Sequence, residues 1–214
     1  DLILTNPPFG GMEEDGIEDN FPTKYRTRET ADLFMGLIMH LLKNEGGRAG
    51  VVLPDGFLFG EGVKTTLKQE LLTGFNLHTI VRLPKGVFSP YTSFATNILF
   101  FEKGTATESV WFYEMQADGY SLDDKRSKQE GYGDLQEIVA RFHGRDAEKD
   151  TDRTAKWFCV LRADIEAEGY DLSLSRYKED VFEEVAYEAP GVIVERLLVA
   201  EMGEEFFNRE IREK

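Results

Sequence analysis

Residues 1–10 read Asp-Leu-Ile-Leu-Thr-Asn-Pro-Pro-Phe-Gly, and this stretch decides the fold. Its first five residues predict a buried strand, which leads directly into Asn6-Pro7-Pro8-Phe9. A residue before proline is driven out of the α region into an extended conformation, and each proline fixes its own φ. We therefore expect a stiff loop after the strand, with carbonyl acceptors held in fixed directions and few N–H donors.

Helical and strand patterns alternate after this loop. Thr30 suits the N-cap of a helix that Gly46-Gly47 ends. Its apolar face is expected to consist of Ala31, Phe34, Leu37, Ile38, Leu41 and Leu42. The later elements are a strand over 49–54, a helix over 61–73, and strands over 77–83, 96–101 and 110–113. The last two strands have no helix between them, so we expect an antiparallel edge pair there. This alternation indicates an α/β fold, an open parallel or mixed sheet covered by helices.

The chain is expected to divide into three parts. Residues 1–116 carry the sheet, and residues 117–189 form an acidic, irregular extension with a short helix from Leu135 to His143. Residues 190–214 form an amphipathic helix that begins at Pro190, a favoured residue of the first helical turn. Because residues 1–5 already have the pattern of a strand, the chain opens in mid-sheet, and we expect part of the native protein to lie upstream.

The net charge of −15 is concentrated in the second half of the chain. Residues 1–104 contain 13 acidic and 10 basic side chains, whereas residues 105–214 contain 27 acidic and 15 basic ones. Non-specific DNA affinity comes from Lys and Arg that displace counterions. If the substrate is DNA, another segment or subunit must therefore supply much of the affinity. The alternative is an acidic surface that serves solubility.

The chain has no apolar run near the roughly 20 residues that span a membrane. It also has no signal-like start, and its single cysteine, Cys159, forms no internal disulfide. We expect a cytoplasmic protein. Cys159 lies in an apolar run and is expected to pack in the core instead of acting as the nucleophile that cytosine-C5 methylation needs. His40, His78 and His143 lack metal-ligand spacing, so no metal site is expected.

The loop after the first strand has the groups to hold a planar NH2 group. The side-chain oxygen of Asn6 and the carbonyl of Pro7 can each accept one hydrogen, and Phe9 can stack on the ring that carries the amine. Two acceptors would localise the nitrogen lone pair and stabilise the positive charge that develops as the nitrogen attacks a sulfonium methyl group. The alternative is a Pro-Pro loop that only ends a strand, with Asn6 capping a turn.

Residues 1–10 resemble motif IV of amino-methyltransferases that use S-adenosylmethionine, and the later segments resemble the modification (M) subunit of type I restriction-modification systems. The matching segments are 31–34, 46–54, 80–84, 86–88, 91–92, 96–99, 169–173 and 176–177. The resemblance implies the C-terminal half of a Rossmann-like S-adenosylmethionine-dependent methyltransferase sheet, mixed and with antiparallel edge strands. It also implies methylation of adenine N6 in DNA.

The resemblance assigns roles to individual residues. Asn6 and Pro7 would hold the N6 amine of adenine, and Phe9 would stack on the base, which must be flipped out of the duplex. Pro8 would join Phe88 in binding the substrate, with Phe88 as a second aromatic residue against the flipped base. A buried anchor for its own loop is the alternative role of Phe88.

S-adenosylmethionine is the implied cofactor. In the family, the strand and glycine-rich turn that bind it precede the Asn-Pro-Pro-Phe motif, which begins here at residue 6. Asp32 and Phe34 fall in a segment that the family uses near the cofactor, although Phe34 also suits core packing. The glycine-rich residues 46–50 follow a helix and precede a strand, the reverse of a nucleotide-binding loop. We expect this chain alone to bind the cofactor poorly and to be inactive.

The implied partners are DNA and the specificity (S) and restriction (R) subunits of a type I complex. The C-terminal helix carries a stripe that could dock on a partner helix or pack on its own domain: Ile193, Leu197, Ala200, Phe207 and Ile211. Two other functions stay open. The loop could hold the NH2 group of a protein glutamine or of an rRNA guanine, or the chain could be a non-catalytic assembly module that binds a specificity subunit through residues 105–214.

Overall fold

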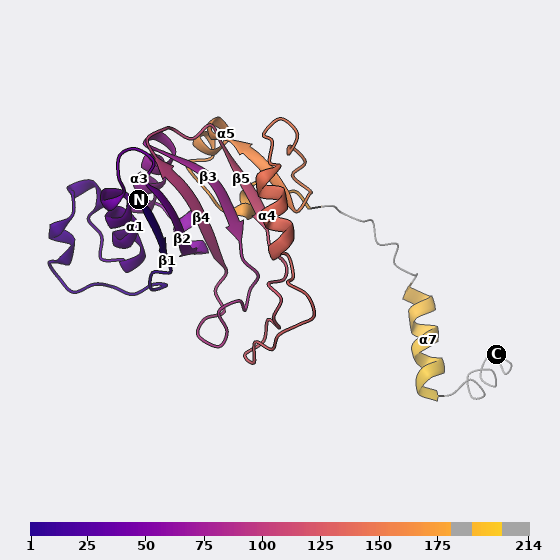
Figure 1. Ribbon diagram of the computed structural model, residues 1–214. Coiled ribbons are helices and arrows are strands. Elements are labelled where there is room, and N and C mark those ends of the chain that lie inside the picture. The colour runs from indigo at the N-terminus through magenta and orange to yellow at the C-terminus, as the bar shows by residue number, and fades with distance from the viewer. Residues whose placement is uncertain (181–189, 203–214) are drawn as a thin grey trace. The chain divides into compact units, whose positions relative to one another are not determined.

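The computed structural model describes residues 1–180 and 190–202. Residues 1–179 form one compact unit, built around a six-stranded sheet in the order β1-β2-β4-β3-β5-β6 (Figure 1). The strands are β1 (Leu2–Thr5), β2 (Arg48–Pro54), β3 (Phe75–Arg82), β4 (Thr96–Lys103), β5 (Ser109–Glu114) and β6 (Trp157–Leu161). The helices described in this unit are η1 (Ile17–Asn20), η2 (Thr23–Tyr25), α1 (Thr30–Leu41), α2 (Asp55–Phe59), α3 (Val63–Thr73), α4 (Leu135–His143), α5 (Arg162–Ala167) and α6 (Leu174–Tyr177).

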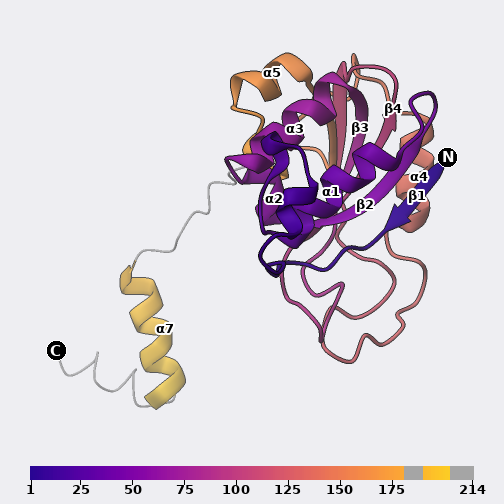
Figure 2. The same cartoon turned by 90° about the vertical axis from the view of Figure 1, so that its left-hand side faces the viewer.

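Helices cover both faces of the sheet (Figure 2). On one face, α1 and α3 bury Met35 and Leu67 in a core shared with strand residues such as Ile80. On the other face, α4 packs Phe142 against a second core that contains Trp111. β3, β4, β5 and β6 contribute apolar side chains to both cores, as the sequence predicts for a covered sheet. β1 differs, because Leu2 and Leu4 are exposed, so the predicted burial of this strand is wrong for one of its faces.

The loops that follow β1, β2 and β3 meet at one edge of the sheet. β1 is parallel to β2, and β3 is parallel to β5. β4 runs antiparallel to both of its neighbours, β2 and β3. The strands that share one direction are therefore β1, β2, β3 and β5, and their carboxyl ends lie at the same edge. In open α/β sheets that edge is where ligands bind.

The predicted antiparallel pair of strands 96–101 and 110–113 is wrong. β4 lies inside the sheet between β2 and β3, and β5 pairs with the far side of β3 in parallel. The connection between β4 and β5 crosses the start of β3, where the buried Thr107 makes three hydrogen bonds. Its N–H donates to Leu72 O at 3.0 Å, its hydroxyl donates to Phe75 O at 2.9 Å, and the hydroxyl accepts from Leu77 N at 2.8 Å. β5 consequently emerges beyond β3 instead of folding back on β4.

The acidic part of the chain contributes to the sheet and to its core. Sequence analysis predicts only one helix there, over Leu135–His143, and α4 confirms it. The structure adds β6, which pairs antiparallel with β5 and forms the edge of the sheet. Leu172 and Tyr177 are buried in the core beneath α3. These short apolar segments become ordered through contacts with distant residues, which local periodicity does not reveal.

The buried face of α1 differs from the expected one, and the helix that begins at Pro190 belongs to a different unit from the sheet. In α1, Leu37 and Leu41 are exposed, while Met35 and Met39 are buried, so the core-facing stripe is turned from the expected one. The predicted helix start at Pro190 is confirmed by α7 (Pro190–Met202), which belongs to a second unit. The predicted stripe positions Phe207 and Ile211 lie outside the described residues. No described helix is long and apolar enough to cross a membrane.

Candidate functional site

The loop after β1 and the loop after β3 meet through two aromatic rings. Phe9 ends the Asn6-Pro7-Pro8-Phe9 segment, hereafter the NPPF loop, and Phe88 lies in the loop that follows β3. Their ring centroids are 5.3 Å apart, and the rings are inclined by 61° in an edge-to-face contact. Both side chains are half-buried. The fold therefore brings together the two aromatic residues for which the sequence predicts a role beside a planar ring.

The polar end of the NPPF loop is open. Asn6 is exposed, and within residues 1–180 and 190–202 its side chain makes no hydrogen bond. Pro7 is buried, whereas Pro8 is exposed. The loop is thus anchored at Pro7 beside a free amide. An amide with no partner inside the protein keeps its oxygen available for an incoming donor.

The loop from residue 84 to residue 95 holds Phe88 in place. Its base is closed by the bond from Leu83 N to Thr96 O, at 2.9 Å. Inside it, Ser89 N donates to Gly86 O at 3.0 Å, and Tyr91 N donates to Phe88 O at 2.9 Å. Phe88 itself packs against the second core. The loop is therefore locally folded, and Phe88 contacts both the second core and Phe9.

A buried polar cluster lies behind this edge, and sequence analysis did not single out its members. Asp55, the first residue of α2, accepts hydrogen bonds from Arg82 of β3 and from Asn97 Nδ2 of β4, the latter at 3.0 Å. Asn97 is completely buried, and its Oδ1 has no partner. The cluster ties together the ends of three strands. A charged and a polar residue inside apolar strands were the available signals in the sequence.

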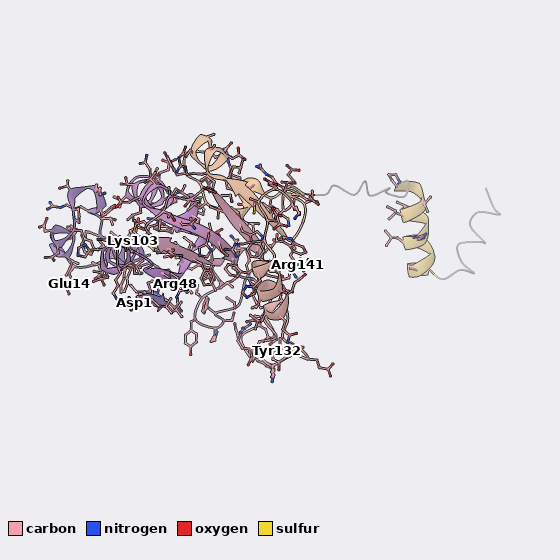
Figure 3. The ribbon with its side chains drawn as sticks, turned by 45° about the horizontal axis from the view of Figure 1, so that its top comes forward. Asp1, Glu14, Arg48, Lys103, Tyr132 and Arg141 are labelled. Carbon is pink, nitrogen blue, oxygen red and sulfur yellow. The ribbon has the colours of Figure 1, made fainter. Side chains whose placement is uncertain are left out.

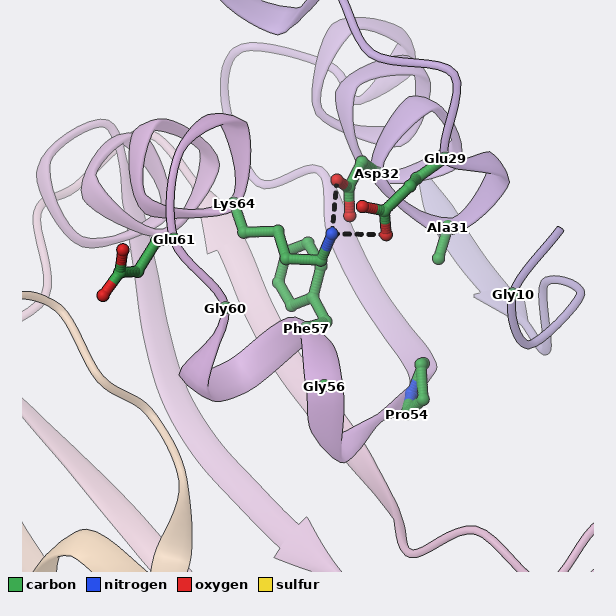
Figure 4. A pocket seen from close by; sticks show the side chains of 10 residues that line it. All are labelled: Gly10, Glu29, Ala31, Asp32, Pro54, Gly56, Phe57, Gly60, Glu61 and Lys64. Carbon is green, nitrogen blue, oxygen red and sulfur yellow. Dashed lines mark hydrogen bonds and ion pairs between the residues drawn. The ribbon is translucent and has the colours of Figure 1, made fainter. Parts of the chain in front are cut away.

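A cavity of about 410 Å³ opens beside the NPPF loop, between α1, α2 and the start of α3 (Figure 4). Its lining residues are Gly10, Glu29, Ala31, Asp32, Pro54, Gly56, Phe57, Gly60, Glu61 and Lys64. Lys64 donates to Asp32 Oδ2 at 2.9 Å and also pairs with Glu29. Asp32 is only 2% exposed, and its Oδ1 has no hydrogen-bond partner. Burial raises the pKa of Asp32, while Lys64 favours its charged form.

The two residues expected near the cofactor are placed differently. Asp32 lines the cavity, whereas Phe34 is half-buried on α1 and is not among the lining residues. The lining carries three carboxylates and one ammonium group, which suits a ligand with positive charge. The glycines of residues 46–50 lie elsewhere, at the start of β2, and do not line this cavity. Among the described residues, the lining of this cavity therefore offers mainly carboxylates to a ligand.

The remaining candidate side chains lie away from this edge. Cys159 is half-buried on β6, and burial raises the pKa of its thiol to about 11, which disfavours the nucleophilic thiolate. Burial, helped by Arg145, lowers the pKa of His78 to about 4. Among the described residues, no group of three or more His, Cys, Asp or Glu side chains could hold a metal ion.

The model of the protein family described as N-6 DNA Methylase matches residues 1–185. The chain belongs to this family. A methylase subunit of the type I restriction enzyme EcoEI from Escherichia coli is 68% identical to this N-6 DNA methylase chain over 114 residues, which are 53% of the chain and 23% of that subunit. The chain therefore spans about a quarter of the length of this relative.

Two solved structures have the same fold as this N-6 DNA methylase chain. A modification subunit assigned to a type I restriction enzyme of Vibrio vulnificus YJ016 is 38% identical, with a TM-score of 0.71 over 87% of this chain and 40% of that one. The M protein of the type I restriction enzyme EcoKI is 27% identical, with a TM-score of 0.61 over 94% of this chain and 50% of that one. The expected α/β fold class, a mixed sheet with an antiparallel edge, is confirmed.

Proposed function

We propose that this chain holds the target base for methylation of adenine N6 in DNA, as part of a type I modification subunit that uses S-adenosylmethionine. The observation that carries the proposal is the contact of Phe9 with Phe88 beside the unpartnered Asn6 amide. An aromatic wall next to free acceptors suits a flat heterocycle with an exocyclic amine. The family membership and the type I relatives support the same activity.

The NPPF loop acts on the amine during the reaction. Asn6 Oδ1 and the Pro7 carbonyl oxygen each accept a hydrogen bond from one N6 hydrogen. These two bonds keep the nitrogen lone pair from delocalising into the ring. S-adenosylmethionine, when bound, supplies an electrophilic methyl group. The amine held by the two acceptors would take up this methyl group through its lone pair and would then release one proton to solvent. The two acceptors stabilise the positive charge that develops on N6, so the transition state gains more than the bound base does.

The rings of Phe9 and Phe88 hold the adenine ring, with Pro8 exposed beside them. A base inside a duplex is unreachable, so it must leave the stack, and an aromatic wall compensates for the stacking that it loses. The cluster of Asp55, Arg82 and Asn97 positions the loop of Phe88 from behind, because this loop runs from Arg82 of β3 to Asn97 of β4.

Asp32 is the residue that we assign to the cofactor side of the site. Its buried, unpartnered Oδ1 lies in the acidic cavity beside Gly10, directly after the NPPF loop. Phe34 is assigned to the packing of α1 against the same region. The chain alone is expected to bind the cofactor weakly and to be inactive, since of the two residues assigned to the cofactor only Asp32 lines the cavity.

Partner binding is assigned to DNA and to the specificity and restriction subunits of a type I complex. The composition of α7 supports assembly, since this helix carries the apolar residues Val192, Ile193, Val194 and Leu197. A helix with these apolar residues is stabilised when another surface covers it. The same observation favours the second candidate function, a non-catalytic assembly module. A location in the cytoplasm stays a prediction.

A methylation assay tests the proposal. The complete subunit that carries these residues is offered tritiated S-adenosylmethionine with plasmid DNA, rRNA or a glutamine-containing protein substrate. We expect label in DNA adenine, a loss of at least about 100-fold in Asn6→Ala, and no change in Asn44→Ala, an exposed asparagine outside the site. Label only in RNA or protein would instead support the N-methyltransferase alternatives. Assembly with a specificity subunit but no methylation of any substrate would support the assembly module.

A further inference from the structure

Two long loops project side by side from the edge of the sheet that carries the NPPF loop (Figures 1 and 2). Residues 84–95 follow β3 and contain Phe88, and residues 116–134 connect β5 to α4; together we name them the two-loop tip. They touch at Gly86, which has φ +86°, so closely that a Cβ there would overlap the carbonyl oxygen of Leu122. The second loop is thus packed against the loop that carries Phe88.

The second loop is also folded. Gln129 N donates to Gly119 O at 2.8 Å, and Tyr120 and Lys128 form an antiparallel bridge. At its base, Asp134 Oδ2 accepts from the backbone of Gln116 at 2.6 Å. A loop held in this way presents its exposed side chains in fixed positions. The loss of conformational entropy on binding is therefore small.

The two-loop tip exposes aromatic rings that belong to neither core. Tyr91 is 93% exposed and Phe94 is 66% exposed, and both follow Phe88 in the same loop. On the neighbouring loop Tyr132, which is labelled in Figure 3, is 62% exposed. Aromatic side chains bury large areas when they bind, so their exposure on folded loops beside a candidate site marks a binding surface.

The loop that carries Tyr91 and Phe94 is the basic part of the tip, because residues 84–95 contain Lys85 and no carboxylate, in contrast to the net charge of −15 of the chain. Within the part of the chain that the structure describes, Lys85, Lys125 and Lys128 form no ion pair. Of the carboxylates of the tip, Asp118 pairs with Arg126 and Asp134 pairs with Lys156, whereas Asp123, Asp124 and Glu130 form no ion pair within the described residues. Cations interleaved with aromatic rings are the pattern that binds single-stranded nucleic acid.

We propose that the two-loop tip binds the unpaired bases that flank the flipped adenine, which stack on Tyr91 and Phe94 while lysines of the tip contact the phosphates. The proposal rests on the proposed function, since it takes DNA as the substrate. Stacking on aromatic rings is tolerant of base sequence. The tip therefore adds affinity for opened DNA and no choice of recognition site.

The test measures binding of the 214-residue chain to two fluorescein-labelled duplexes, one fully paired and one with a central unpaired segment. Tyr91→Ala and Phe94→Ala are each expected to weaken binding of the opened duplex by about 5- to 100-fold, as for the loss of one stacking contact. Tyr91→Phe retains the ring and should stay within about twofold, and Lys85→Gln should reduce the salt dependence by about one phosphate contact. The matched control is Phe59→Ala, because Phe59 is 58% exposed but lies on α2.

Cross-linking locates the contact independently of affinity. Oligonucleotides with 5-bromouracil in the unpaired segment should cross-link to peptides that contain Tyr91, Phe94 or Tyr132. Cross-links confined to residues outside the two-loop tip overturn the proposal. An equal loss of affinity in Phe59→Ala also overturns the proposal. So does the absence of any complex at about 1 mM chain, a concentration above the dissociation constants of non-specific DNA binding, about 10⁻⁴–10⁻⁶ M.

Failure of this proposal is distinguishable from failure of the proposed function. Unchanged DNA methylation in Asn6→Ala, with stacking on the tip intact, would remove the role of the NPPF loop alone. Methylation that requires Asn6, with binding that ignores Tyr91 and Phe94, would remove the tip alone.

Discussion

Gly86→Ala is expected to disrupt the joint between the two loops of the tip. Gly86 has φ +86°, where a side chain costs about 1–2 kcal/mol. The new methyl group would also overlap the carbonyl oxygen of Leu122 and lie 3.1 Å from its carbonyl carbon. Overpacking against backbone costs about 1–3 kcal/mol. The free energy of unfolding should therefore fall by about 2–5 kcal/mol.

Two other glycines separate the backbone cost from the steric one. Gly16 has φ +93° and no atom within 4 Å of an added Cβ, so Gly16→Ala should cost only about 1–2 kcal/mol. Gly56 has neither a positive φ nor a close neighbour, and it lies in α2. Gly56→Ala should stabilise the chain by up to about 1 kcal/mol, because alanine favours the helix.

Urea unfolding followed by circular dichroism measures all three variants, and the NMR signals of Phe88 report whether its loop moves. The reasoning predicts that Gly86→Ala is the least stable and shifts the Phe88 signals, while Gly16→Ala leaves them unchanged. Equal losses in Gly86→Ala and Gly16→Ala would refute the close approach of the two loops, because only the φ cost would then remain.

Three further predictions concern the core and the site. Burial lowers the pKa of His78 from 6.5 to about 4. Between these two pH values the unfolded chain binds one more proton than the folded chain, so the free energy of unfolding should fall by up to about 3 kcal/mol as the pH falls from 6.5 to 4. His78→Gln should remove this part of the pH dependence. Burial lowers the pKa of Lys68 from 10.5 to about 8, so stability should rise by up to about 3 kcal/mol between pH 8 and 10.5, and Lys68→Met, titrated in the same way, should not show this rise. A double-mutant cycle of Phe9→Ala and Phe88→Ala in urea unfolding should give a coupling of about 0.5–1.5 kcal/mol, whereas a coupling of zero would contradict the ring contact.

Local patterns predicted several elements well. The stiff dipeptide of prolines after an apolar run marks the end of β1, and helical spacing predicts α4 over Leu135–His143 as observed. Pro190 marks the start of α7. Each of these features depends on neighbours in the chain, so the backbone preferences of a few residues are sufficient to predict it.

Features that depend on distant partners were missed. The place of β4 inside the sheet follows from the path of the chain across the start of β3, where Thr107 bonds to β3 and α3. β6 exists because β5 offers it a free edge. The exposed Leu37 and Leu41 show that a helix with apolar residues on several sides does not reveal which side the sheet covers.

The candidate site divides in the same way. The sequence by itself determined which groups the NPPF loop carries, because two prolines stiffen the backbone beside one amide and one aromatic ring whatever surrounds them. Only the tertiary structure decided that Phe88 meets Phe9, that Asp55 holds Arg82 and Asn97 together, and that the two loops of the tip lie side by side. These contacts join residues far apart in the chain, and they form because the parallel strands all end at one edge of the sheet.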